Sequence, residues 1–133
     1  MMITTLLETD YATLWYYPEA KIVHHAFHKY IYGAQFRAVM RRGLDHFQEQ
    51  RLTKWLSDDR RNSALPQADL DWSLEEWFPG MLEAGWKYWA VVLPENAVGR
   101  QNMERVINTY EERGLTIKTF SEPNEALEWL QSV

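Results

Sequence analysis

The sequence has no cysteine among its 133 residues, so it forms no disulfide bond and offers no thiolate nucleophile or cysteine-ligated zinc site. No apolar run approaches the roughly 20 residues that a membrane helix requires. The first eight residues carry no basic segment and end in an acid, which is not typical of a signal peptide or an anchor. We therefore expect a cytoplasmic protein that does not associate with membranes.

Short motifs that mark common catalytic and cofactor sites are also absent. The sequence contains no GxxxxGK[ST] phosphate loop, no GxGxxG, no GxSxG and no HExxH. Without cysteine, and without a recognisable serine, histidine and aspartate arrangement, nothing favours nucleophilic catalysis. We therefore expect a protein that is not an enzyme and uses no cofactor or metal.

Positive charge is in deficit, since 14 basic residues face 19 acidic ones and the formal net charge is −5. Such a field repels phosphate backbones and argues against nucleic acid as a partner. Apolar residues make up 46% of the chain and charged residues 25%, a balance that supports a buried core. The length fits one domain, so we predict a single domain over residues 1–133.

Five segments have the composition of β-strands and four have helical periodicity. The predicted strands are residues 11–17, 21–30, 54–58, 88–93 and 115–120, the first two joined as a hairpin at Pro18. The predicted helices start after Gly33, near Leu70, before Met103 and at Pro123, and Pro79 should kink or divide the second. This order predicts an α/β fold with a mixed five-stranded sheet.

Three histidines, His24, His25 and His28, stand close together in the sequence. On a strand, His24 and His28 share one face about 13 Å apart at roughly 3.3 Å per residue, while His25 points to the other face. We expect structural or surface histidines rather than a metal site.

Asp58 and Asp59 follow the third predicted strand, and in open α/β sheets binding sites gather at such strand ends. Adjacent acids on an extended chain diverge, and Arg60 and Arg61 are at hand to neutralise them. A salt-bridged loop is the first interpretation. The alternatives are an anion or phosphate pocket built on the two arginines and the next helix N-terminus, and a phosphate-handling enzyme using the two aspartates.

Seven tryptophans are many for a chain of this size. Trp72 and Trp129 fall off the apolar stripes of the predicted helices, Trp86 sits at a helix-to-strand junction, and Trp77 lies on the stripe of the second helix. Stray aromatic residues are often half-buried rim residues; the alternative is a homodimer face or a cleft for an apolar ligand. We include Trp72, Trp77 and Trp86 among the candidate ligand- or partner-binding residues.

Three short segments and their spacing carry a family resemblance: WLSDDR at residues 55–60, EWFP at 76–79 and VVLP at 91–94. With the element order, they resemble a group of uncharacterised bacterial STAS/SEC14-like proteins over nearly the whole chain. The resemblance implies a STAS-like fold with helices mainly on one face of the sheet, and a non-enzymatic regulatory module that binds an unknown protein partner and forms a homodimer. Its SEC14 part suggests a carrier or sensor of a small apolar ligand in a tryptophan-lined cleft.

STAS domains of the anti-sigma-factor-antagonist type carry a phosphorylatable serine in a glycine-containing segment where the third strand meets the second helix. The corresponding segment here, residues 57–65, contains no glycine and several charges. Ser63 is the serine nearest that position and completes the set of candidate site residues.

Overall fold

Six strands form one mixed sheet in the computed structural model, which describes residues 2–133. The strands are β1 (Thr4–Glu8), β2 (Ala12–Tyr17), β3 (Ile22–Phe27), β4 (Lys54–Asp58), β5 (Tyr88–Val92) and β6 (Thr116–Phe120). They lie side by side in chain order; β1 to β3 are antiparallel, and β3 to β6 are parallel. The carboxyl ends of four strands therefore meet at one edge of the sheet.

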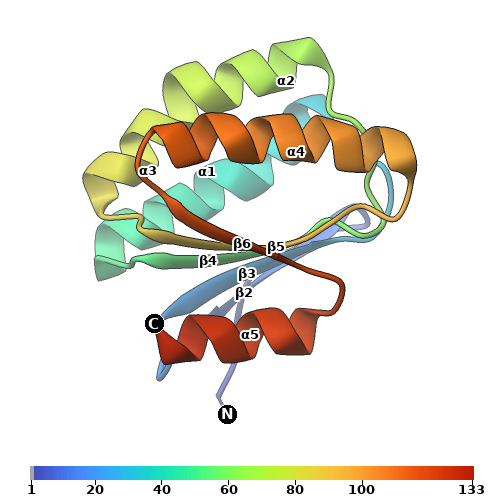
Figure 1. The fold of residues 1–133 in the computed structure, drawn as a ribbon. Coiled ribbons are helices and arrows are strands. Elements are labelled where there is room, and N and C mark those ends of the chain that lie inside the picture. Colours follow the sequence, from blue (N-terminus) through green and yellow to red (C-terminus); the bar gives the residue numbers. More distant parts are fainter. Residues whose placement is uncertain (1) are drawn as a thin grey trace.

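The helices cover the two faces of this sheet unequally (Figure 1). They are α1 (Gly33–Gln50), α2 (Gln67–Trp72), the π-helical segment η1 (Ser73–Trp77), α3 (Phe78–Ala84), α4 (Ala97–Glu112) and α5 (Pro123–Ser132). Helices α1 to α4 lie on one face, and α5 lies on the other. No helix of the described residues is both long and apolar enough to span a membrane.

The prediction of a mixed α/β sheet is confirmed, but the prediction of five strands is wrong, because β1 adds an edge strand. The pairing of β1 with β2 shifts between Thr5 and Leu7, which marks a β-bulge. A bulge breaks the two-residue alternation of a strand and lets Leu6 and Leu7 both pack against the core. A six-stranded sheet in simple chain order also does not agree with the STAS-like architecture that the resemblance implies.

Alternation along the parallel strands divides the core into two layers. In β4, Trp55 belongs to the larger layer under α1 to α4, and Leu56 to the smaller layer under α5. In β5, Trp89 and Ala90 divide in the same way. Since β5 is covered on both faces, its sequence is a continuous apolar run.

The predicted break at Pro79 takes the form of a π-helical segment. Residues 67–84 form a nearly continuous helix in which η1 separates α2 from α3, and Pro79 is the second residue of α3. Proline has no N–H to donate, so the hydrogen-bond pattern of the preceding turn is free to widen. Such π-helical turns occur often at functional sites.

Candidate functional site

A cavity of about 320 Å³ lies between the sheet and the helices of the larger layer, at the carboxyl ends of β3 and β4. Its lining comes from β3, β4, the loop after β4, β5, α1, α2, η1 and α4. Aromatic and long apolar side chains dominate, among them Phe27, Phe36, Met40, Leu74, Trp77 and Trp89. The position, volume and lining are those of a small-molecule pocket in an open α/β sheet.

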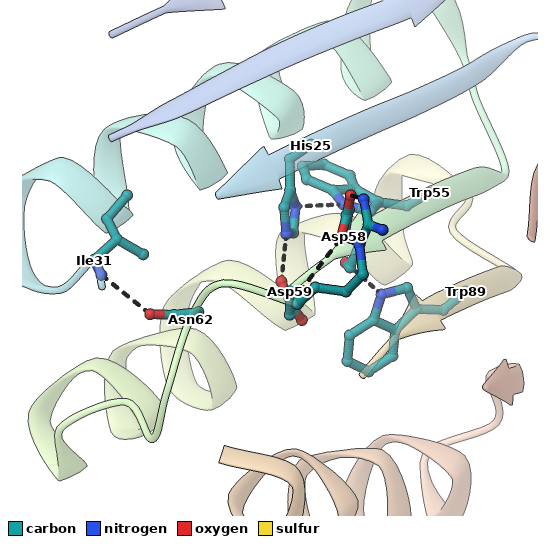
Figure 2. A network of polar contacts seen from close by, with 9 residues as sticks. His25, Ile31, Trp55, Asp58, Asp59, Asn62 and Trp89 are labelled. Atoms are coloured by element: carbon teal, nitrogen blue, oxygen red, sulfur yellow. Dashed lines mark hydrogen bonds and ion pairs between the residues drawn. The ribbon is translucent and has the colours of Figure 1, made fainter. Parts of the chain in front are cut away.

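A buried histidine and carboxylate meet in the lining of this cavity (Figure 2). The side chains of His25 and Asp59 are 2% and 3% exposed, and His25 Nε2 lies 2.7 Å from Asp59 Oδ1. On the other side of the ring, the indole Nε1–H of Trp55 donates to His25 Nδ1 at 3.0 Å. Because Nδ1 accepts a hydrogen bond, the ring proton is on Nε2, where it is donated to Asp59.

Ser57 and Trp89 form the next polar contact of the lining. The indole Nε1–H of Trp89, on β5, donates to Ser57 Oγ at 2.7 Å. Ser57 pairs with His25 in the register of β3 and β4, so the two side chains are neighbours on the same face of the sheet. The Ser57 hydroxyl keeps its own hydrogen available for another acceptor.

The loop after β4 is held in place by hydrogen bonds from three other segments. Asp59 N donates to the carbonyl of Val92 at 3.0 Å, and Ile31 N donates to Asn62 Oδ1 at 3.1 Å. The amide of Asn96, the N-cap of α4, donates to the carbonyl of Asn62 at 3.1 Å. These bonds fix the loop, and with it the carboxylate of Asp59, against the ends of β3 and β5.

One buried carboxylate also anchors the helical wall of the cavity. Asp69 on α2 accepts from Gly33 N at 2.8 Å and from Arg37 Nε at 3.1 Å. Gly33 has a φ of +61°, which a residue with a side chain rarely adopts, so this N–H can point at α2. The contact fixes the first turn of α1 against α2.

The aromatic wall continues from the cavity into the core. Trp77 Nε1 donates to the carbonyl of Met40 at 2.8 Å, and its ring meets Trp55 edge-on at 5.5 Å between centroids. Tyr110 on α4 stacks on Phe78 at 4.0 Å. Burial raises the pKa of the Tyr110 phenol, so the group stays neutral across the physiological range.

Of the predicted loop residues, only Asp59 reaches the cavity. Asp58 points to the opposite face, where Arg60 Nε and Nη2 donate to its two oxygens at 3.0 and 2.9 Å. Arg60 also lies 3.7 Å from Glu122. The two aspartates therefore do not form a shared acid pair, and the pKa of Arg60 is raised mainly by its bond to Asp58.

Arg61 and Ser63 lie outside the cavity. Arg61 is exposed, and Ser63 Oγ donates to Asn96 Oδ1 at 3.3 Å. A second, more open hollow lies beside Arg60 and Arg100, but Arg60 is already bound to Asp58 and Arg100 donates to the carbonyl of Glu95. The described residues thus bring no free pair of arginines together for a phosphate.

The three candidate tryptophans have different places. Trp77 lines the cavity, whereas Trp72 and Trp86 do not. Trp72 is buried, and the guanidinium groups of Arg37 and Arg41 lie over its ring at 5.3 and 5.1 Å. Trp86 is buried among the other rings, so Trp72 and Trp86 are core residues and not the half-buried rim residues of the first interpretation. No tryptophan is among the exposed large apolar residues of the described chain, so this burial does not support the alternative of a tryptophan homodimer face.

The three histidines lie apart, as strand geometry requires. His24 faces Tyr17, with Nδ1 2.8 Å from Tyr17 Oη; His25 lies on the cavity side; and His28 Nε2 is 2.7 Å from Thr13 Oγ1. Desolvation lowers the pKa of His24 to about 4. Within residues 2–133, no group of three or more histidine or acidic side chains is placed to hold a metal ion.

His25, Ser57 and Trp89 were missed as site residues by sequence reasoning. A usable signal was present, because His25 lies near the end of one parallel strand and Ser57 and Asp59 at the end of the next. The apparent histidine cluster drew attention to a metal instead of to the neighbouring strand.

Comparisons with protein-family models, with curated proteins and with solved structures found no match for this chain. The STAS/SEC14-like resemblance therefore stays a prediction, and the function is argued from the geometry of the cavity.

Proposed function

We propose that this protein binds a small, largely apolar ligand in the cavity between the sheet and helices α2, η1 and α4. The observation that carries the proposal is a cavity of about 320 Å³ whose lining combines aromatic side chains with a buried, hydrogen-bonded His25–Asp59 pair. Ligand pockets have this composition, with a few fixed polar groups among apolar walls. The proposed function corresponds to the carrier or sensor of a small apolar ligand that the SEC14 part of the resemblance suggests.

The fixed geometry of the lining supports ligand binding. His25, Ser57 and Asp59 each have a hydrogen-bond partner on another segment, so they do not need to be ordered when a ligand enters. A pocket that is already ordered loses less conformational entropy on binding, which favours affinity. The buried aromatic side chains of the lining, Trp77 and Trp89, also suit a carrier or sensor of an apolar ligand.

Filling the cavity tests the proposal. Val106 of α4 lines the cavity and is partly buried, so Val106→Phe should occupy part of the volume that a ligand needs. We expect ligands that raise the melting temperature of the wild-type protein to lose at least about tenfold in affinity for this variant. The readouts are thermal shift against a panel of small aromatic and branched aliphatic compounds, and native mass spectrometry of the purified protein.

Val98→Phe is the matched control, because it makes the same change on the same helix at a residue that is 63% exposed and outside the cavity. It should leave every affinity unchanged. Equal binding by both variants, or a panel in which no compound stabilises the wild-type protein, contradicts the proposal.

Homodimer formation is a second proposal, favoured by the free edge of β1. This strand pairs only with β2, and Met2 and Ile3 beside it are 62% and 53% exposed. An edge strand with few charges is a surface on which a second copy can add its own strand. Light scattering after size exclusion measures the mass of the protein in solution. A wild-type dimer that becomes a monomer on Ile3→Lys supports pairing through β1. A wild-type monomer excludes the homodimer.

A further inference from the structure

The charge inside the cavity is unbalanced. Asp59 is a carboxylate with a side chain only 3% exposed. Its one hydrogen-bond partner on the cavity side is His25, and His25 is held in a neutral form because Trp55 donates to its Nδ1. A neutral donor satisfies Asp59 Oδ1 but adds no positive charge to offset the carboxylate.

No lysine or arginine of residues 2–133 forms an ion pair with Asp59, whose contact of this kind is with His25 at 2.7 Å. Arg60, the next residue, turns away to Asp58 and Glu122. Arg105 is the one basic residue in the lining, but it is exposed on α4. Within the same residues, no side chain or backbone N–H donates to Asp59 Oδ2 either. The cavity lining therefore holds an accessible carboxylate oxygen, Asp59 Oδ2, with no donor and no lysine or arginine beside it.

The rest of the lining accommodates a cation as well as an apolar body. Trp77, Trp89 and Tyr110 all present aromatic rings in the lining. The face of an aromatic ring attracts a cation within about 6 Å, and this attraction adds to that of a carboxylate. A charged donor also makes a hydrogen bond roughly twice as strong as a neutral one.

We propose that the ligand is a small amine: an apolar, preferably aromatic, body that carries one protonated amino group, which donates to Asp59 Oδ2 and neutralises its buried charge. The body lies against the aromatic walls. This inference rests on the proposed function, since it names the class of ligand that the same cavity takes. Carboxylic acids and phosphates are excluded by repulsion from Asp59.

Four probes that share one frame test the inference: 2-phenylethylamine, 2-phenylethanol, phenylacetate and ethylbenzene. Calorimetric titration at pH 7 measures their affinities, and the change in total tryptophan fluorescence follows occupancy. We expect 2-phenylethylamine to bind at least about tenfold more tightly than 2-phenylethanol, and phenylacetate to bind most weakly of the four.

Asp59→Asn tests the role of the carboxylate. The amide oxygen can still accept from His25, but the negative charge is lost, so the amine should bind no better than the alcohol while ethylbenzene binds as before. Asp45→Asn is the control, because it removes the same charge at an exposed residue of α1 that lies outside the cavity. It should change the affinity for the amine less than about threefold. If Asp59→Asn does not fold, the wild-type order of the four probes decides alone.

The outcomes separate the inference from the proposed function. If the hydrocarbon and the alcohol bind but the amine has no advantage, the amine class is wrong and the apolar pocket stands. If phenylacetate binds best, the sign of the charge is wrong. If Asp59→Asn keeps the preference for the amine, Asp59 is not its partner. If none of the four binds to the wild-type protein, the proposed function fails together with the inference.

Discussion

Gly43, on α1, shows how closely a single residue is fitted to the site. A methyl group at this position would lie 2.1 and 2.3 Å from two ring carbons of Trp55. The same indole donates the hydrogen bond that fixes His25. Because Gly43 has no side chain, the indole of Trp55 can lie against α1, and the indole N–H fixes the tautomer of His25 in the cavity.

We predict that Gly43→Ala destabilises the protein by about 2 kcal/mol. Alanine in a helix gains up to about 1 kcal/mol over glycine in propensity, but overpacking a filled core costs roughly 1–3 kcal/mol, and this overlap is with a rigid ring that also makes a hydrogen bond. The loss should appear as a lower urea midpoint with an unchanged slope.

Gly80→Ala on α3 is the matched control for that measurement. Its methyl group would meet only the flexible side chain of Leu44, at 3.3 Å. Its effect should be within about 1 kcal/mol of zero. Equal losses in the two variants would show that helix geometry, and not the indole of Trp55, sets the cost at Gly43.

At the scale of elements, the sequence predicted the helices and strands whose burial leaves a pattern within one short segment. The run at residues 88–93 corresponds to β5, because burial on both faces leaves a continuous apolar run. The stripe after Gly33 corresponds to α1, because burial on one face leaves a helical period. The strand β1 was missed since its bulge removes the alternation and its edge position leaves most of it exposed. An edge strand has too few buried residues to leave a period.

The candidate site could be predicted only in part, because its residues come from segments far apart in the sequence. The position of Asp59 after a strand marked it as a candidate, but its partner is 34 residues away in the sequence. Which of two adjacent aspartates faces the cavity depends on how the chain turns after β4, and Arg60 fixes this by binding Asp58. Parallel pairing of β3 and β4 brings His25 and Ser57 together, and no local pattern encodes that pairing.

At the scale of the whole molecule, the two faces of the sheet hold histidines in different states. His25 on the cavity face has partners on both ring nitrogens. His24 on the opposite face is 8% exposed, and its Nε2 has no partner among the described residues. Burial of that ring opposes its protonation, and this links the stability of the whole fold to pH.

We predict that the protein loses stability as the pH falls from about 6.5 to 4. Desolvation is the main cause that lowers the pKa of His24 from 6.5 to about 4; the charge of Arg60 acts in the same direction and that of Asp58 in the opposite one. Above pH 6.5 the ring is neutral in both the folded and the unfolded chain, so stability is highest there. Below that pH the unfolded chain takes up a proton first, and the loss reaches about 3 kcal/mol near pH 4.

Urea unfolding at pH 7.5, 5.5 and 4.5 measures this loss, and His24→Gln tests its source, because the variant has no titrating group at that position. The variant should lose most of the pH dependence over this range, whatever its stability at pH 7.5. A remainder is expected from His46, whose pKa is also lowered by burial. His28→Gln, at an exposed histidine, should keep the wild-type dependence. If His24→Gln keeps it as well, the protons are taken up elsewhere and the buried ring does not link folding to pH.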